Sequence, residues 1–171
     1  FLIRGIEDET PRARGDLDVA DDAPTIPSGT VAPPPSGAKA ALGDPAQIGV
    51  LLGHERVIET KDLDASAALT GFPRADAEGR RLVPAGQWTN PVRLLQEYFD
   101  CPTTIHFQGR VWHHNPLYDD ERLVTRGMIT EFYERGGNQV VRFLVIEETP
   151  DGRPIATIDH HSVYRLARAD A

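Results

Sequence analysis

Residues 122–166 read RLVTRGMITEFYERGGNQVVRFLVIEETPDGRPIATIDHHSVYRL, and this stretch decides the fold. Two turn signals divide it, Gly136-Gly137-Asn138 and Asp151-Gly152, and both are typical of tight hairpins. The segment between them, residues 139–149, contains an unbroken apolar run, which favours a strand covered on both faces. The sequence therefore predicts three successive antiparallel strands.

The apolar residues of this region predict which side chains share a face of a strand. In the first strand, the spacing places Val124, Met128 and Phe132 on one face. A fourth strand is predicted upstream, at residues 103–112. Its apolar positions alternate with polar ones, namely Ile105, Phe107 and Val111 against His106, Gln108 and Arg110.

The corner HHNPLYDDE, residues 113–121, lies between two predicted strands. Proline, asparagine and aspartate are the residues expected in a turn, so a turn explains the stretch without any ligand. His113 and His114 are adjacent and point to opposite faces of an extended chain, so they cannot chelate one ion together. The same holds for His160 and His161, and we predict no metal site. We expect one histidine of each pair to face the inner side of the sheet and to be hydrogen-bonded there.

A helix is predicted upstream of the strands, at TNPVRLLQEYF, residues 89–99. Asn90 can cap it, Pro91 suits the first helical position, and apolar residues recur at helical spacing at Val92, Leu95 and Phe99. A short strand from Ile48 and a small helix between Thr60 and Gly71 precede it. The economical way to bury these elements is a curved sheet wrapped around one apolar helix, which is an α+β architecture.

Residues 49–166 resemble the hot-dog fold, and more narrowly the MaoC-like dehydratase/hydratase family, in particular its N-terminal-type repeat. Residues 113–157 carry most of the similarity: Pro116 and Leu123 fall at matching positions, while Asp120 and Glu121 replace the family's Gly-Asp pair. The resemblance implies an enoyl-thioester hydratase or dehydratase that acts on acyl-CoA or acyl-carrier-protein (acyl-ACP) thioesters without a cofactor.

The catalytic pair of the family is absent from this sequence. MaoC-like hydratases place an aspartate in a GDxNPxH loop with a histidine close by, and the two exchange protons with water. Here Gly71 aligns with the glycine, Phe72 stands where the aspartate is expected, and no histidine follows. The chain is therefore either an enzyme with other residues, a non-catalytic structural subunit of a hetero-oligomeric dehydratase, or an acyl-thioesterase.

Three side chains are candidates for a catalytic role. Asp76 is the carboxylate nearest to the missing motif, and Glu97 lies on the predicted helix. Gln87, with Thr89, resembles the sets that direct water in hot-dog thioesterases. The alternative is structural: Asp76 is a solvated loop acid, Glu97 faces solvent, and Thr89 is a capping residue.

The residues before the helix are candidates for binding the thioester. A backbone N–H at Gly86 and the amide of Gln87 lie just ahead of Asn90, where they can meet a carbonyl oxygen. Trp88 can line an acyl pocket, although it can equally belong to the core. We therefore predict a substrate site formed by Gly86, Gln87, Trp88 and Asn90.

Composition limits the partners and divides the chain. Residues 1–46 are rich in proline and acidic residues, which predicts an arm or linker, and residues 47–168 form the hot-dog domain. The net charge of −8 argues against nucleic acid and anionic membrane surfaces. One cysteine, Cys101, excludes an intrachain disulfide and favours the reducing cytoplasm. An exposed sheet edge predicts a homodimer or a heterodimer with another hot-dog subunit.

Overall fold

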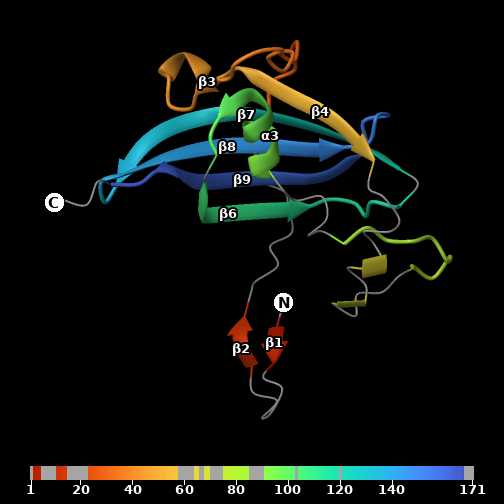
Figure 1. The fold of residues 1–171 in the computed structure, drawn as a ribbon. Coiled ribbons are helices and arrows are strands. Elements are labelled where there is room, and N and C mark those ends of the chain that lie inside the picture. The colour runs from red at the N-terminus through yellow and green to blue at the C-terminus, as the bar shows by residue number, and fades with distance from the viewer. Residues whose placement is uncertain are drawn as a thin grey trace.

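A computed structural model describes residues 2–4, 11–14, 23–57, 64–65, 68–69, 75–84, 91–102, 104–119 and 121–167. Figure 1 shows a curved sheet with a helix lying across its inner face. The elements with described bounds are β1 (Leu2–Arg4), β2 (Pro11–Arg14), β3 (Ala40–Ala41), a 3-10 helix (Pro45–Gln47), β4 (Leu51–Val57), α3 (Pro91–Tyr98), β5 (Phe99–Asp100), β6 (Ile105–His113), β7 (Arg122–Arg135), β8 (Asn138–Glu148) and β9 (Pro154–Arg165).

The main sheet has five antiparallel strands in the order β4-β7-β8-β9-β6 (Figure 1). Both predicted hairpins are confirmed, since β7, β8 and β9 follow one another across the turns at residues 136–137 and 150–153. Gly136 and Gly137 have φ of 57° and 76°, backbone angles that a residue with a Cβ rarely adopts. The strand predicted at residues 103–112 is β6, and the helix predicted at 89–99 contains α3.

The corner at residues 114–121 joins strands that are not neighbours. β6 lies at one edge of the sheet and pairs with β9, whereas β7 lies beside β4 near the other edge (Figure 1). The chain therefore crosses the end of the sheet between His113 and Arg122. The sequence predicted a turn here, and it could not show that the turn spans the width of the sheet, because strand pairing is a long-range property.

Helix α3 packs its apolar side directly on the sheet. Leu94 and Leu95 are 1% and 0% exposed and belong to the main core cluster. A Cβ built on Gly127 of β7 would lie 2.5 Å from Cδ2 of Leu94, so the absent side chain lets the helix approach the strand. The prediction of one apolar helix held by a curved sheet is confirmed.

The predicted apolar residues of β7 do not share one face. Leu123 and Ile129 are fully buried, and Gly127 lies on the same side, so Val124 and Met128 point to the opposite face. An irregularity between Ile129 and Glu131 shifts the alternation, which brings Phe132 back to the helix side. The prediction that Val124, Met128 and Phe132 share one face is wrong, because the irregularity places Phe132 on the side opposite to Val124 and Met128.

Residues 23–47 lie against the domain. Leu42 is 4% exposed and belongs to the same core cluster as α3. The hydroxyl of Tyr98 donates to the carbonyl of Ala32 at 2.6 Å and accepts from the N–H of Gly53 at 3.1 Å. β3 pairs in parallel with β5. Part of the segment predicted as an arm thus contributes core and hydrogen bonds to the domain.

Candidate functional site

A cavity of about 230 Å³ lies beside the first residue of α3. Pro91, Val111 and Ile158 provide its apolar wall, and two histidines, His106 and His160, line it together with Gly109. The lining comes from α3, β6 and β9, which are separated in sequence and meet only through the fold. His106 and Val111 are exposed, so the rim of the cavity is open to solvent.

A bulge in β6 turns His106 toward the cavity. The pairing of β6 with β9 runs from His106 with Ser162 to Gln108 with His161, which leaves Phe107 as the additional residue. His106 and Gly109 therefore point to the same side of the sheet. A Cβ at Gly109 would lie only 3.0 Å from Cε1 of His106, so the glycine provides the space that the imidazole occupies.

His160 is the buried member of the site. It is 5% exposed, its Nε2 is 2.8 Å from Oγ of Ser162, and its ring contacts His106 edge-on with centroids 4.4 Å apart. Burial, followed by the neighbouring His106 and His161, lowers the pKa of His160 to about 4. The imidazole is therefore neutral near pH 7 and keeps one donor and one acceptor nitrogen.

Two other histidines of the doublets, His114 and His161, are also hydrogen-bonded. His161 lies on the outer face, where its Nδ1 is 2.8 Å from the Tyr133 hydroxyl, and burial lowers its pKa. Nε2 of His114 is 3.0 Å from Oγ1 of Thr157. The expectation that one histidine of a doublet faces inward and is hydrogen-bonded there is confirmed for His160.

Glu97, one of the three predicted catalytic candidates, forms an ion pair in the structure. Its Oε2 is 2.9 Å from Nδ1 of His54 on β4, and its Oε1 is 3.5 Å from Nε of Arg93. The side chain of Glu97 is 34% exposed and that of His54 15%, so the pair lies at the margin of the core. Nothing in the spacing of these residues predicted the contact.

A buried carboxylate, that of Glu147, lies on the inner face of the sheet in line with His54. Thr125 is the cross-strand partner of His54, and its hydroxyl donates to Oε2 of Glu147 at 2.6 Å. Glu147 is 1% exposed. The inner face thus carries a second group of polar side chains, His54, Glu97, Thr125 and Glu147, toward the opposite edge of the sheet from the cavity.

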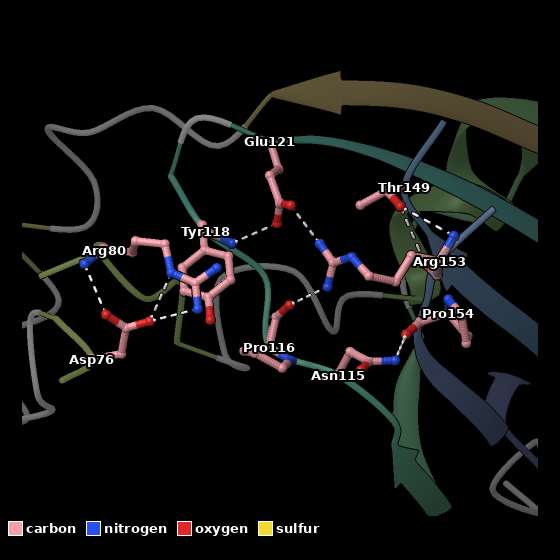
Figure 2. A network of polar contacts seen from close by, with 9 residues as sticks. All are labelled: Asp76, Arg80, Asn115, Pro116, Tyr118, Glu121, Thr149, Arg153 and Pro154. Carbon is pink, nitrogen blue, oxygen red and sulfur yellow. Dashed lines mark hydrogen bonds and ion pairs between the residues drawn. The ribbon is translucent and has the colours of Figure 1, made fainter. Parts of the chain in front are cut away.

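Asp76 closes a turn in the loop at residues 75–84 (Figure 2). Its carboxylate accepts from the backbone N–H groups of Glu78 and Arg80 and from the Arg80 side chain. Burial alone would raise the pKa of Asp76, but hydrogen bonds from Arg80 and Tyr118 and the Arg80 charge lower it. The guanidinium of Arg80 also lies 4.0 Å from the centre of the Tyr118 ring. Asp76 is therefore ionised and held by its own loop.

The corner at residues 114–121 is held by Arg153 (Figure 2). The guanidinium donates to the carbonyl of Pro116 at 2.7 Å and to the carboxylate of Glu121, while Glu121 also accepts from the N–H of Tyr118 at 3.0 Å. The Asn115 amide donates to the carbonyl of Pro154 at 2.7 Å. Hydrogen bonds within the protein thus hold the described residues Asn115, Pro116, Tyr118 and Glu121 of this corner.

The predicted binding residues Gly86, Gln87, Trp88 and Asn90 lie outside the described residues, so their role stays a prediction. They immediately precede Pro91, which lines the cavity. Sequence reasoning did not select His106 or His160 as site residues. The doublet at His160 was visible in the sequence, but the bulge that brings His106 beside it was not.

The described residues contain no group of three or more histidine, cysteine, aspartate or glutamate side chains arranged to hold a metal ion. No helix within them is both long and apolar enough to cross a membrane.

Comparisons with known proteins identify the fold. No family model matches the sequence, and no curated protein matches it. Solved structures do match. The (R)-hydratase from A. caviae involved in PHA biosynthesis has a TM-score of 0.59 and 14% identity over 71% of this chain and 98% of that chain. The MaoC-like dehydratase from Rhodospirillum rubrum has a TM-score of 0.53 and 14% identity over 71% and 94%.

A third neighbour is a complex, the 3R-hydroxyacyl-ACP dehydratase HadBC from Mycobacterium tuberculosis. Its TM-score is 0.56, with 14% identity over 68% of this chain and 96% of that chain. At this identity the likeness concerns the fold. The five-stranded antiparallel sheet wrapped around α3 is the hot-dog fold, as predicted, and its structural neighbours include MaoC-like dehydratases and (R)-hydratases.

Proposed function

We propose that this chain is a MaoC-like hot-dog subunit that binds an acyl-CoA or acyl-ACP thioester in the cavity at the start of α3. The observation that carries the proposal is the composition of that cavity. Val111 and Ile158 offer an apolar wall to an acyl chain, and His106 and His160 offer polar nitrogens to the thioester group. This is the combination that a ligand with an apolar chain and one carbonyl requires.

The position of the cavity supports the same proposal. The first turn of a helix has N–H groups without helical partners, and these groups together with the helix dipole stabilise negative charge on a carbonyl oxygen. Pro91 opens α3 and lines the cavity; proline itself has no N–H, so the donors of this first turn are the N–H groups that follow it. The predicted binding residues Gly86, Gln87, Trp88 and Asn90 come directly before it. We therefore place the thioester carbonyl near this helix end, with no cofactor needed for hydration chemistry.

The same proposal includes a partner subunit. β6 is an edge strand of the sheet, and Ile105, Phe107 and Val111 on it are 48%, 38% and 40% exposed. An unpaired edge with exposed apolar side chains favours addition of another strand. We propose that β6 pairs with a second hot-dog subunit, identical or related, in the cytoplasm. The charge of −8 makes nucleic acid or an anionic membrane a poor partner.

A binding titration tests the thioester proposal. The purified chain is titrated with butyryl-CoA and with CoA alone, and the acyl-CoA is expected to bind more tightly. Val111→Trp should fill the cavity and weaken butyryl-CoA binding by about tenfold or more, which is the loss of about 1.4 kcal/mol. Val124→Trp, on the opposite face of the sheet, is the matched control. Equal binding of both ligands, or equal loss in both variants, contradicts the proposal.

Trp88 provides an independent test of the predicted binding residues. If Trp88 lines the acyl pocket, Trp88→Ala should change butyryl-CoA affinity more than it changes the melting temperature. A drop in melting temperature with unchanged affinity would assign Trp88 to the core instead.

A second candidate function is that of a non-catalytic subunit in a hetero-oligomeric dehydratase. The observation that favours it is Phe72, which stands where the family has its aspartate. Hydration of crotonyl-CoA by the purified chain supports an active hydratase. Inactivity that is rescued by a second hot-dog subunit supports the structural role, and release of free CoA would indicate the acyl-thioesterase.

A further inference from the structure

We infer that His106 is the proton-transferring residue of this chain and replaces the missing aspartate–histidine pair in the hydration of an enoyl thioester. The inference rests on the proposed function, because it requires the cavity to hold the acyl thioester. It adds an acid–base centre that does not come from the loop where the family motif is absent.

The position of His106 is the first argument. An ordinary alternation along β6 would place residues 107, 109 and 111 on one side and His106 on the other. The bulge at Phe107 instead brings His106 onto the cavity side with Gly109 and Val111. Bulges that re-aim one side chain are frequent beside active sites. The lack of a side chain at Gly109 then leaves room for the imidazole.

The availability of its nitrogens is the second argument. Three other histidines use a ring nitrogen in a contact: His54 with Glu97, His114 with Thr157, and His161 with Tyr133. Within the described residues, His106 makes ring contacts but no hydrogen bond through its imidazole. An exposed imidazole at the rim of a cavity, with both nitrogens available, is suited to exchange a proton with water.

His160 and Ser162 act as positioning residues beneath it. The Ser162 hydroxyl holds the ring of His160, and the edge of one imidazole contacts the face of the other at 84°. His160 stays neutral, so it places no positive charge beside His106. The buried pair thus supports the ring that faces the ligand.

The reaction balances without any further reagent. A nitrogen of His106 removes a proton from a water molecule while the water oxygen bonds to the β-carbon of the enoyl thioester. The electron pair of the C=C bond moves toward the thioester carbonyl, whose oxygen gains the charge that the start of α3 stabilises. The imidazolium then returns the proton to the α-carbon. The product is a 3-hydroxyacyl thioester and His106 is regenerated.

The test separates catalysis from binding. Crotonyl-CoA hydration is measured for the full chain and for His106→Gln, and butyryl-CoA affinity is titrated in parallel. We expect kcat to fall by about a hundredfold or more while butyryl-CoA affinity changes by less than about threefold. His161→Gln, which removes a histidine from the outer face beside His160, is the matched control and should keep full activity.

A second variant covers the case in which His106→Gln does not fold. Gly109→Ala would place a methyl group 3.0 Å from Cε1 of His106 and shift the imidazole by a few tenths of an ångström. We expect it to reduce kcat about tenfold or more without altering butyryl-CoA affinity.

Three results would be decisive. Full hydration activity in both variants, or a wild-type chain that binds butyryl-CoA and does not hydrate crotonyl-CoA, overturns the inference and leaves the proposed function standing. No binding of butyryl-CoA by the wild-type chain overturns both.

Discussion

The packing of α3 on the sheet makes Gly127→Ala an informative substitution. In an ordinary strand this change stabilises a protein by about 0.5–1 kcal/mol, because glycine loses more conformational freedom on folding. Here the new methyl group would lie 2.5 Å from Cδ2 of Leu94 and 3.3 Å from the carbonyl oxygen of Leu144. Leu94 is 1% exposed, so its side chain has no free space into which to move.

Overpacking of this kind costs about 1–3 kcal/mol. After subtraction of the gain from removing a glycine, we expect a net loss of about 1–2 kcal/mol in the free energy of unfolding. Urea unfolding followed by circular dichroism measures it. With a slope of about 2 kcal/mol per molar urea, the midpoint should fall by about 0.5–1 M.

Two controls sharpen this prediction. Gly37→Ala, where a Cβ would meet nothing within 4 Å, should leave the midpoint unchanged or raise it slightly. Leu94→Ala alone should cost about 2–5 kcal/mol, and the double variant should cost less than the sum, because the new methyl group fills part of the vacated space. A Gly127→Ala protein as stable as the wild type would refute the placement of α3 against β7.

Three further perturbations test other parts of the structure. The pKa of His160 is lowered from 6.5 to about 4, so between these pH values the unfolded chain binds a proton that the folded chain excludes. The free energy of unfolding should therefore fall as the pH is lowered from about 6.5 toward 4. The loss should reach about 2–3 kcal/mol and should be smaller in His160→Gln. Arg153→Lys should lower the free energy of unfolding by about 1 kcal/mol, because a lysine cannot reach the Pro116 carbonyl and the Glu121 carboxylate together. An unchanged melting temperature would contradict this. If β6 forms the proposed subunit contact, Ile105→Lys should lower the mass measured in sedimentation from that of a dimer to that of a monomer, whereas an unchanged mass would exclude β6 as the contact.

Much of the secondary structure could be predicted from short patterns. The turns at Gly136–Gly137 and Asp151–Gly152 bound β8, and the helix predicted around Pro91 is observed. Turn chemistry, capping and helical periodicity act within a few residues, so the sequence contains all the information that they require. The same holds for the absence of the family's motif at Phe72.

Only the tertiary structure decided which side chains meet. The bulges in β6 and β7 reverse the side to which His106 and Phe132 point, and no residue type in the sequence predicts such a shift. The contact of His54 with Glu97 requires β4 and α3 to be placed first. Contacts of this kind depend on the register of the strands and on how distant segments come together, and the packing of the whole sheet around α3 determines both. The alternation of local residues therefore predicted the strands of this protein, while the cavity at Pro91 exists only once those strands are assembled.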